Sequence, residues 1–451
     1  MTPNTYAVDE PFRDEIALAE QKAIDNQLTS HTNPLLKVDI LPGKGRGFVA
    51  TSIVLPGTIL HTSVPLAATV SDEWTPETCG WCFNFSYPKK MRHKALDELE
   101  SREMSTKWTK ENKSKKTISI SQKKLLFCSK ECKSAYLSHG YSREWELHIA
   151  TLSLLEKETK RRAGLAAEEP DTTPEDNTIP TEFIELDDDI RVQQWIDEAW
   201  SCITQATDFI SQAKLYSSGP ADNTMCRLIA ACLVRKQCEE ASLYPDISIS
   251  SYKDLLTIQD NELSHFRIQY RASMPTHRNS IPYTKGQPVS AFLKYMPPSV
   301  LDIIRTSLFF SAALSAPGIE PRLEYSHELF RSVYFREMSN SFGIWEIPKN
   351  PSAITEEQGV TDDLELLGWG IYPMAVYFNH SCDANVIKLR RDRNMVFVAR
   401  RTIQKGEEAC ISYGSVGEGV KERRERLLEH YHFVCACDRC CNEEKEEKCR
   451  L

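Results

Sequence analysis

The sequence contains no long apolar run and none of the features of a secretory leader. No stretch of roughly 18 or more apolar residues occurs, so we expect no transmembrane helix and no membrane partner. The N-terminal residues Met1–Tyr6 lack the basic and apolar regions of a signal peptide. We therefore expect the protein in the cytoplasm, the nucleus or both.

Positive charge is not in excess either, and no segment of the chain is repeated. A formal net charge of −9 argues against a general nucleic-acid-binding surface, and we expect no sequence-specific binding of nucleic acid. The lack of a repeat with a period of roughly 20–50 residues excludes a solenoid or propeller. With 451 residues, 41% of them hydrophobic, the chain can form two or three domains. We expect the protein to be a monomer.

Cysteine, by contrast, is abundant. The chain has 15 cysteines, and in a reducing compartment clustered thiols are more often metal ligands than disulfides. Cysteines in apolar, helix-like sequence, such as Cys226 and Cys232, are more simply interpreted as small buried side chains. Three groups have the short spacing of metal ligands: Cys79 with Cys82, Cys128 with Cys132, and Cys435, Cys437 and Cys440 in a C-x-C-x-x-C pattern.

The order of the segments predicts a β region near each end of the chain. Alternating and β-branched residues predict strands, first at 37–41, 48–53 and 58–62, and then from about Tyr334 onward at 375–378, 396–403 and 409–414. If both β regions belong to one fold, the sequence between them is an insertion.

The intervening sequence reads mostly as helix. A Glu-, Leu- and Lys-rich segment predicts a helix over 144–166, and helical spacing dominates from about 190 to 314. The acidic stretch Glu168–Asp189 has the composition of a loop or disordered insertion. Short strands and helices in separate blocks predict an α+β fold.

The tetrad Asn379-His380-Ser381-Cys382 is the most informative motif. It places polar side chains and a thiol directly after the apolar run 375–378, where we expect a buried strand. A buried polar group must be hydrogen-bonded or it costs a few kcal/mol. These side chains therefore brace the backbone, hold a ligand or, for the thiol, bind a metal.

A glycine-rich turn, Gly43-Lys44-Gly45-Arg46-Gly47, opens the first β region. It matches the dinucleotide-binding pattern of glycines only in part, because that pattern requires a helix next, and the following residues are β-like. We therefore reject a Rossmann site. The glycines serve either a tight hairpin with positive φ or the close approach of the backbone to a ligand.

Three motifs together resemble the SET-domain lysine methyltransferases. They are the tetrad 379–382, the segment Gly406-Glu-Glu leading to Tyr413-Gly414, and the cysteine-rich tail. Cys79 to Cys132 also resemble the first zinc site of a MYND finger, which points to the SET and MYND (SMYD-like) branch. Larger members of this branch add a C-terminal helical repeat domain, and we expect this chain to lack it.

The resemblance implies a SET-fold β core of short strands, split by two insertions. The implied segments are an N-terminal arm or helix (1–33), the SET N-terminal part (34–74), a degenerate MYND-like zinc finger with a basic insert (75–150), an acidic linker and helical SET insertion (151–330), the SET C-terminal catalytic part (331–415) and a post-SET zinc-binding tail (416–451).

By the same resemblance, Tyr413 is the catalytic residue. The residues implied to bind S-adenosylmethionine are Lys44, Gly45, Arg46, Gly47, Asn340, Asn379, His380 and Phe433, with Lys44 near the cofactor carboxylate. His380 is then neither a general base nor a metal ligand. Taken alone, Asn340 could equally cap a helix or strand, and Phe433 could be ordinary packing.

Two zinc ions are implied, each with four thiolate ligands. Cys382 joins Cys435, Cys437 and Cys440 in the tail, and Cys79, Cys82, Cys128 and Cys132 form the finger site. The chain departs from a full MYND finger because residues 83–127 contain no cysteine. We therefore expect a single zinc in this finger, and we do not expect His139 or His148 to bind it.

The implied activity is S-adenosylmethionine-dependent methylation of a lysine on a protein substrate, histone or non-histone. The alternative is a catalytically weak or inactive module that uses its SET domain and zinc finger to recruit proteins. The lysine-rich insert between the cysteine pairs reads as a solvated loop or, as a second possibility, as a localisation signal or a contact for an acidic partner.

Overall fold

The structure is a computed structural model that describes most of the chain. It describes residues 34–97, 100–101, 103–104, 106–107, 125–163, 179–206, 220–243, 249–317, 319–347 and 364–450. The expected N-terminal arm and most of the basic insert lie outside these residues. The chain divides into two compact units: unit 1 is Met1–Pro65, Ile347–Glu365 and Tyr372–Leu451, and unit 2 is Leu66–Glu346 and Leu366–Ile371.

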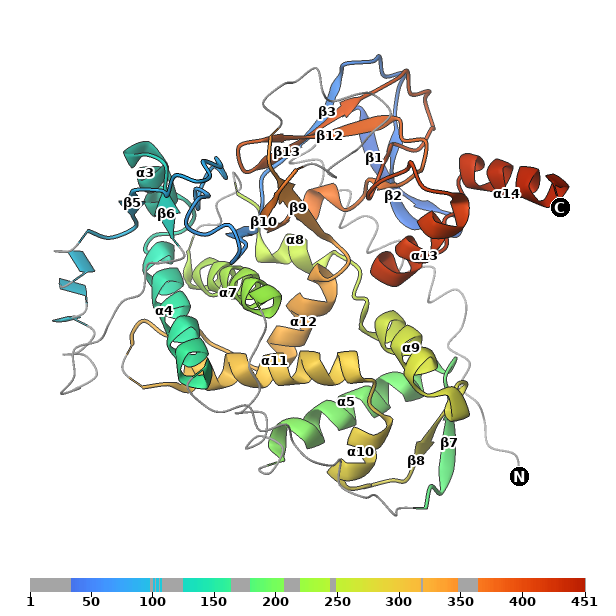
Figure 1. Ribbon diagram of the computed structural model, residues 1–451, viewed down its shortest axis with the longest axis horizontal. Coiled ribbons are helices and arrows are strands. Elements are labelled where there is room, and N and C mark those ends of the chain that lie inside the picture. The colour runs from blue at the N-terminus through green and yellow to red at the C-terminus, as the bar shows by residue number, and fades with distance from the viewer. Residues whose placement is uncertain are drawn as a thin grey trace. The chain divides into compact units, whose positions relative to one another are not determined.

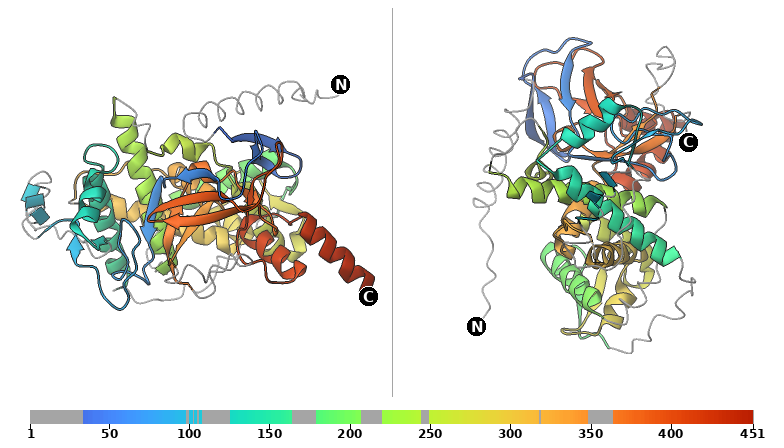
Figure 2. Two further views of the ribbon diagram at one scale, coloured as in Figure 1. Left: turned by 90° about the horizontal axis from the view of Figure 1, so that it is seen from above. Right: turned by 90° about the vertical axis from the view of Figure 1, so that its left-hand side faces the viewer.

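Unit 1 contains short sheets made from both ends of the chain. Strand β1 (Leu36–Leu41) pairs antiparallel with β2 (Gly45–Ala50). Strand β13 (Asn394–Ala399) lies between β12 (Val386–Arg391) and β3 (Ile59–Ser63), so segments more than 330 residues apart are hydrogen-bonded neighbours (Figures 1 and 2). The two predicted β regions therefore do form one core.

The centre of unit 1 is aromatic. Phe378 stacks on Phe397 with ring centroids 4.3 Å apart, and Phe48 meets Phe378 edge to face at 4.7 Å. Phe48 and Phe397 are fully buried. Such pairs contribute roughly 0.5–1.5 kcal/mol each beyond the burial of their area. They fix the backbone of Phe378, which directly precedes the tetrad.

Some expected strands in unit 1 are shorter or absent. The run 375–378 is not a strand. It follows the 3-10 turn η3 (Pro373–Ala375), and its N–H groups form local turn hydrogen bonds, from Ala375 to the carbonyl of Tyr372 and from Phe378 to that of Ala375. Tertiary burial on all sides, rather than a sheet, explains the apolar run. Of the expected strands at 396–403 and 409–414, only β13 and the two-residue β14 (Cys410–Ile411) form.

Unit 2 combines a three-stranded sheet with helices. Strand β10 (Leu366–Ile371) lies between β4 (Ala67–Val70) and β9 (Ser341–Trp345). Strands resume only at Ser341, not near Tyr334 as expected, because Tyr334 belongs to α12 (His327–Glu337). That helix begins at Ser326, whose side chain accepts the Leu329 N–H, and it buries an apolar stripe that includes Phe330 and Val333.

The helical insertion is confirmed, and it also carries a hairpin. Within the predicted acidic loop, residues Glu182–Glu185 form β7, which pairs with β8 (Ser280–Tyr283), so this part of the loop prediction is wrong. The other elements are α4 (Glu144–Ala163), α5 (Asp189–Gln205), α7 (Pro220–Ala241), α8 (Tyr252–Leu256), α9 (Glu262–Ser273), η1 (Pro275–His277), α10 (Val289–Tyr295) and α11 (Pro298–Ser315).

The cysteine-pair region forms a small module of its own within unit 2. The two-residue strands β5 (His93–Lys94) and β6 (Leu126–Phe127) pair, and helix α3 (Lys130–Ser138) contacts both of them (Figure 1). The helix begins at Ser129, whose hydroxyl accepts the backbone N–H of Cys132 at 3.2 Å. This cap satisfies one of the free N–H groups of the first turn and fixes Cys132 in place.

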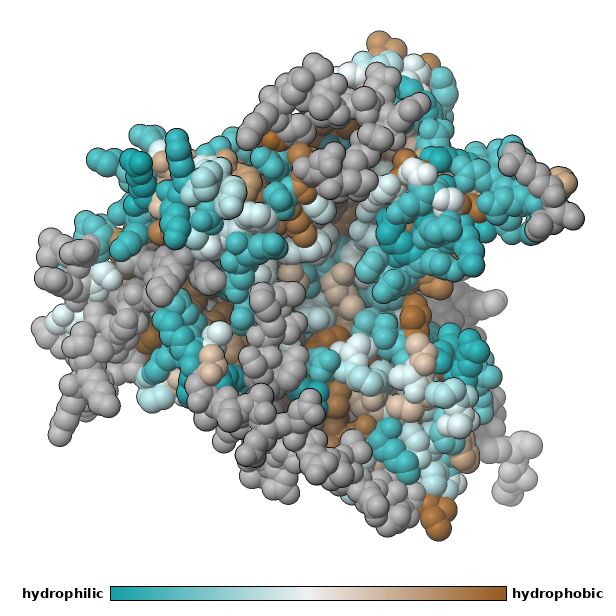
Figure 3. Space-filling model, in the orientation of Figure 1, coloured by the Kyte–Doolittle hydropathy of each residue, from teal (hydrophilic) through white to brown (hydrophobic). Residues whose placement is uncertain are grey.

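The chain ends in two helices, α13 (Val420–Tyr431) and α14 (Asp438–Arg450), with His432 in the left-handed conformation between them. The visible face of α14 is hydrophilic (Figure 3). Among the described residues, no helix is long and apolar enough to cross a membrane. The α+β class is confirmed, with short strands, a helical insertion and two cysteine clusters.

Candidate active site and metal clusters

A very short parallel pairing brings the tetrad and Tyr413 together in unit 1. Strand β11 is only Asn379–His380, and it pairs with β14 so that Asn379 faces Cys410 and His380 faces Ile411. Tyr413 follows two residues after β14. Its backbone N–H donates to His380 Nδ1 at 3.2 Å, and its hydroxyl donates to the carbonyl of Phe378 at 3.1 Å.

The contacts of His380 determine its protonation. Because a backbone N–H can only donate, Nδ1 must be the acceptor, so the ring proton lies on Nε2. Nε2 is 3.2 Å from Cys382 Sγ and donates to it. Burial lowers the pKa of His380 to about 4, so the imidazole is neutral at physiological pH. Both ring nitrogens thus have partners, which leaves neither free to act as a base.

Aromatic rings surround Tyr413. Its ring centroid lies 4.7 Å from that of Tyr431, 5.4 Å from that of His380 and 6.3 Å from that of Phe433. Burial raises the pKa of Tyr413 well above its usual value, so the hydroxyl keeps its proton. Tyr431 also donates to the Tyr413 carbonyl at 3.3 Å. No motif in the sequence singles out Tyr431, because an aromatic residue at a helix end carries no local signal of this role.

Lys44 and Asn379 meet at a carboxylate that the sequence analysis did not select. Lys44 Nζ lies 2.5 Å from Glu408 Oε2, and Asn379 Nδ2 donates to Glu408 Oε1 at 2.9 Å. Burial acts to lower the pKa of Lys44, but the hydrogen bond and charge of Glu408 outweigh it and the pKa is raised. Glu408 stands beside Glu407 in the motif, and only the fold shows which of the two points at Lys44.

Gly47 is required for close packing rather than for its own backbone angle. A Cβ atom there would lie 2.4 Å from Asn379 Nδ2, which is closer than real Cβ contacts allow. Asn379 Nδ2 also donates to the carbonyl of Arg46 at 3.2 Å. Gly43 and Gly45, in contrast, have φ of +71° and +75°, which favours glycine. The hairpin interpretation of the glycine-rich turn therefore holds at Gly43 and Gly45, and a role of the turn toward a ligand stays a prediction.

Asn340 belongs to unit 2. Its side-chain amide donates to the carbonyl of Arg336 at 2.8 Å, and its N–H donates to the carbonyl of Glu337 at 2.9 Å. These bonds satisfy carbonyls at the end of α12, as a capping residue does. Its role toward a cofactor stays a prediction.

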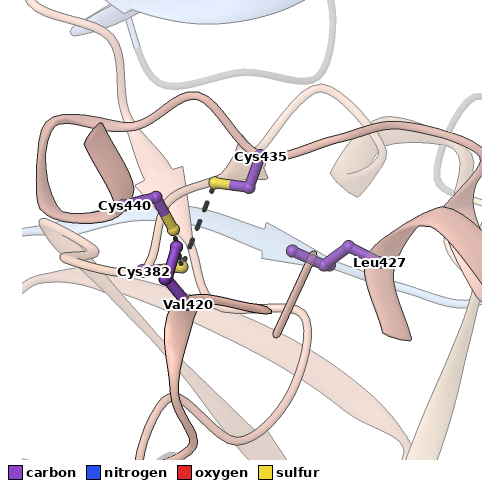
Figure 4. Packing of buried hydrophobic residues seen from close by; sticks show 5 residues of the cluster. All are labelled: Cys382, Val420, Leu427, Cys435 and Cys440. Atoms are coloured by element: carbon purple, nitrogen blue, oxygen red, sulfur yellow. Dashed lines mark hydrogen bonds between the residues drawn. The ribbon is translucent and has the colours of Figure 1, made fainter. Parts of the chain in front are cut away.

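The tetrad's thiol lies in a cluster with the three tail cysteines. The sulfur atoms of Cys382, Cys435, Cys437 and Cys440 all lie within 4.8 Å of one another. Sγ of Cys382 is 3.9 Å from that of Cys435 and 3.4 Å from that of Cys440, and Figure 4 shows these sulfurs turned toward one another. Tyr413, Tyr431 and Phe433 pack against the same cluster.

These distances fit a metal and not a disulfide. Thiolates around a tetrahedral zinc with Zn–S bonds of about 2.3 Å lie about 3.8 Å apart, whereas disulfide sulfurs are separated by about 2.0 Å. A buried arginine, Arg423, donates to Cys440 Sγ at 3.4 Å. Together with the His380 contact, this supplies donors to sulfurs that carry negative charge when they bind a metal.

The finger cysteines form a second cluster in unit 2. Sγ of Cys82 is 3.7 Å from that of Cys128, which is 3.5 Å from that of Cys132, and Cys79 completes the group. A hydrogen bond with Cys82 lowers the pKa of the Cys79 thiol to about 5. This geometry also fits tetrahedral zinc.

His139 and His148 have partners of their own near this cluster. His139 Nε2 lies 3.2 Å from Arg235 Nη2, and His148 Nδ1 lies 2.9 Å from the hydroxyl of Tyr136. Arg235 is buried and also bonds to Glu144 and to the carbonyl of Ser250. In the structure both histidines therefore take part in hydrogen bonds that hold the finger module.

Comparison with known proteins agrees with this architecture. The chain is 25% identical over 418 residues to "Potential protein lysine methyltransferase SET6" of Saccharomyces cerevisiae, which covers 91% of this chain and 96% of that protein. It is 30% identical over 139 residues to "Histone-lysine N-methyltransferase ASHR2" of Arabidopsis thaliana, covering 29% of this chain and 33% of that protein.

A further relative matches over a shorter part. The chain is 34% identical over 84 residues to human "Histone-lysine N-methyltransferase SMYD3", which covers 19% of this chain and 20% of that protein. The family model described as "SET domain" matches residues 45–414, which is most of the chain and confirms the resemblance drawn from the motifs. The chain therefore belongs to the SET-domain family.

Proposed function

We propose that this protein is an S-adenosylmethionine-dependent protein-lysine N-methyltransferase. The SET-domain match and the lysine methyltransferases among the relatives support protein-lysine methylation. The observation that carries the proposal is the β11–β14 pairing, after which the Tyr413 backbone N–H donates to the side chain of His380. In this arrangement a half-buried tyrosine, the aromatic rings beside it and the strand that follows Lys44 lie in one unit.

The chemistry of these residues fits the proposed cofactor. Lys44 supplies a cation for a carboxylate, Asn379 an amide for polar groups, and Phe433 an aromatic face for a ring. S-adenosylmethionine supplies, when bound, a methyl group activated on a positively charged sulfur. The two cysteine clusters would each hold one zinc ion, which serves structure rather than catalysis.

The residues around Tyr413 are suited to align an amine rather than to act as a base. Free lysine has a pKa of about 10.4, and burial among aromatic side chains lowers such a pKa because the charged form is disfavoured. The Tyr413 hydroxyl donates its proton to the Phe378 carbonyl in a hydrogen bond, so its oxygen can accept a hydrogen bond from the amine. Holding the nucleophile in line with the methyl group lowers the entropic part of the barrier.

The first test is methyl transfer to proteins. Purified chain, labelled S-adenosylmethionine and a protein extract should give labelled lysines, and Tyr413→Phe should lower kcat on the order of 100-fold. The variant should still bind S-adenosylhomocysteine, since its ring remains. Tyr87→Phe, at a tyrosine that is 65% exposed, serves as the matched control and should be unchanged.

The same experiment separates the enzyme from a recruitment module. Binding of S-adenosylhomocysteine without any labelled product, with Tyr413→Phe equal to wild type, would favour the module. Absence of binding would reject the proposed cofactor. The substrate protein, histone or non-histone, is identified by sequencing the labelled products.

A further inference from the structure

We propose that His380 is a positioning residue that couples the Cys382 metal cluster to Tyr413. The catalytic consequence of this coupling rests on the proposed function, whereas the hydrogen bonds themselves do not depend on it. The imidazole lies between the two: Nε2 donates to Cys382 Sγ at 3.2 Å, and Nδ1 accepts from Tyr413 N–H at 3.2 Å. One small ring thus joins a metal ligand to the backbone of the predicted catalytic residue.

The two hydrogen bonds depend on each other through the tautomer. A metal-bound thiolate can only accept a hydrogen bond, so it requires the proton on Nε2. That tautomer leaves the lone pair on Nδ1, which is what the Tyr413 N–H needs. If the proton moved to Nδ1, two donors would face each other and the Tyr413 N–H would lose its acceptor.

The position of Tyr413 is fixed at both ends of the residue. Its hydroxyl is fixed by the Phe378 carbonyl, and its backbone by His380 Nδ1 and by Tyr431, which donates to its carbonyl. Loss of the imidazole bond therefore removes one of the two hydrogen bonds at the backbone end while the hydroxyl end stays bonded. Alignment of an in-line transfer is sensitive to a shift of this kind.

Two substitutions separate the halves of the bridge. The amide oxygen of His380→Asn can take the place of Nδ1 and keep the Tyr413 bond, whereas the amide nitrogen of His380→Gln can take the place of Nε2 and keep the Cys382 bond. We expect His380→Asn to release zinc to a chelator about 10-fold faster than wild type. We expect His380→Gln to retain zinc but to expose the Tyr413 amide, with a roughly 10-fold faster hydrogen exchange and a fall in kcat that exceeds any rise in KM.

An internal control distinguishes coupling from unfolding of the strand pair. The Ser381 N–H bonds to the carbonyl of Ile411 at 3.0 Å in the same pairing but does not involve the imidazole. In wild type, removal of zinc should accelerate exchange of the Tyr413 amide much more than that of Ser381. In His380→Asn this difference should shrink, because the link to the sulfur is already absent.

Three results would overturn the inference. They are equal acceleration at Tyr413 and Ser381 in wild type, unchanged exchange at Tyr413 in His380→Gln, and unchanged zinc release in His380→Asn. Exchange and chelation need neither cofactor nor turnover, so they can fail while methyl transfer succeeds, and the reverse. The wild-type measurement decides the question even if a variant does not fold.

Discussion

At the scale of single residues, Glu408 is the main addition that the structure makes to the site. Its carboxylate joins Lys44 on the glycine-rich strand to Asn379 of the tetrad. The Lys44 side chain is 41% exposed and that of Glu408 16%, so solvent screens the ion pair and its strength is at most about 1 kcal/mol. Glu408 therefore competes with any other carboxylate for the same cation.

This competition gives a prediction for Glu408→Gln. The amide oxygen can still accept from Asn379, but the negative charge that pairs with Lys44 is gone, so S-adenosylhomocysteine should bind about 3- to 5-fold tighter. The matched ligand 5′-methylthioadenosine has no carboxylate and should bind as to wild type. Isothermal titration with both ligands measures the difference.

Lys44→Met is the control for this experiment. It should weaken S-adenosylhomocysteine and leave 5′-methylthioadenosine unchanged. Equal loss of affinity for both ligands in Glu408→Gln would mean that the carboxylate only maintains local structure.

At the scale of elements, two of the shortest strands matter most for the site. Strands β11 and β14 have two residues each, yet they place His380 beside Tyr413. Periodicity needs several alternating residues before it can predict a strand. The helix expected over 144–166, by contrast, is close to α4, because its pattern extends over many turns.

A buried glutamate at the end of helix α12 should make the stability of the protein depend on pH. Glu337, the last helical residue, is only 2% exposed, and burial raises its pKa to about 8. An unfolded Glu titrates near 4.3, so the native state binds the extra proton between these values. The contribution of Glu337 to the free energy of unfolding is therefore largest below about pH 4. It decreases by on the order of 5 kcal/mol as the pH rises to about 8.

Glu337→Gln should remove most of this dependence. The amide mimics the protonated acid, so the variant should be more stable than wild type at pH 8 and similar at pH 4. Chemical unfolding at both pH values measures this. A wild-type stability that is flat between pH 5 and 8 would contradict the assignment of a buried neutral Glu337.

At the scale of the whole molecule, each unit has its own cysteine cluster. Unit 1 joins Cys382 to the tail, and unit 2 joins the turn at Cys79 to the start of α3. A structural zinc site contributes folding free energy directly, since the unfolded chain has no preformed site. The two clusters therefore close segments that are distant in sequence, one in each unit.

The metal content should be two zinc ions per chain. Cys437→Ser and Cys82→Ser should each lose one ion, and each should increase hydrogen exchange only around its own cluster. Falling pH should release both metals, because protons compete for the thiolates. Elemental analysis that finds one or four ions in wild type would contradict this assignment, as would loss of both ions from either variant.

The domain boundaries and partners stay predictions at this scale. The basic insert lies mostly outside the described residues, so a contact with an acidic partner is a matter for binding experiments.

The sequence by itself determined the chemistry of the site. Cysteine spacing selected seven of the eight clustered thiols, and the motifs, through the family they resemble, selected Cys382, His380 and Tyr413, because residue type and local spacing are written directly in the chain. Only the tertiary structure decided which side chains meet. The Lys44–Glu408 pair spans 364 positions, and the contact of His380 with both Cys382 and Tyr413 needs a strand pair too short to carry a pattern. Local sequence cannot encode such contacts, since they depend on how distant segments pack around a shared core.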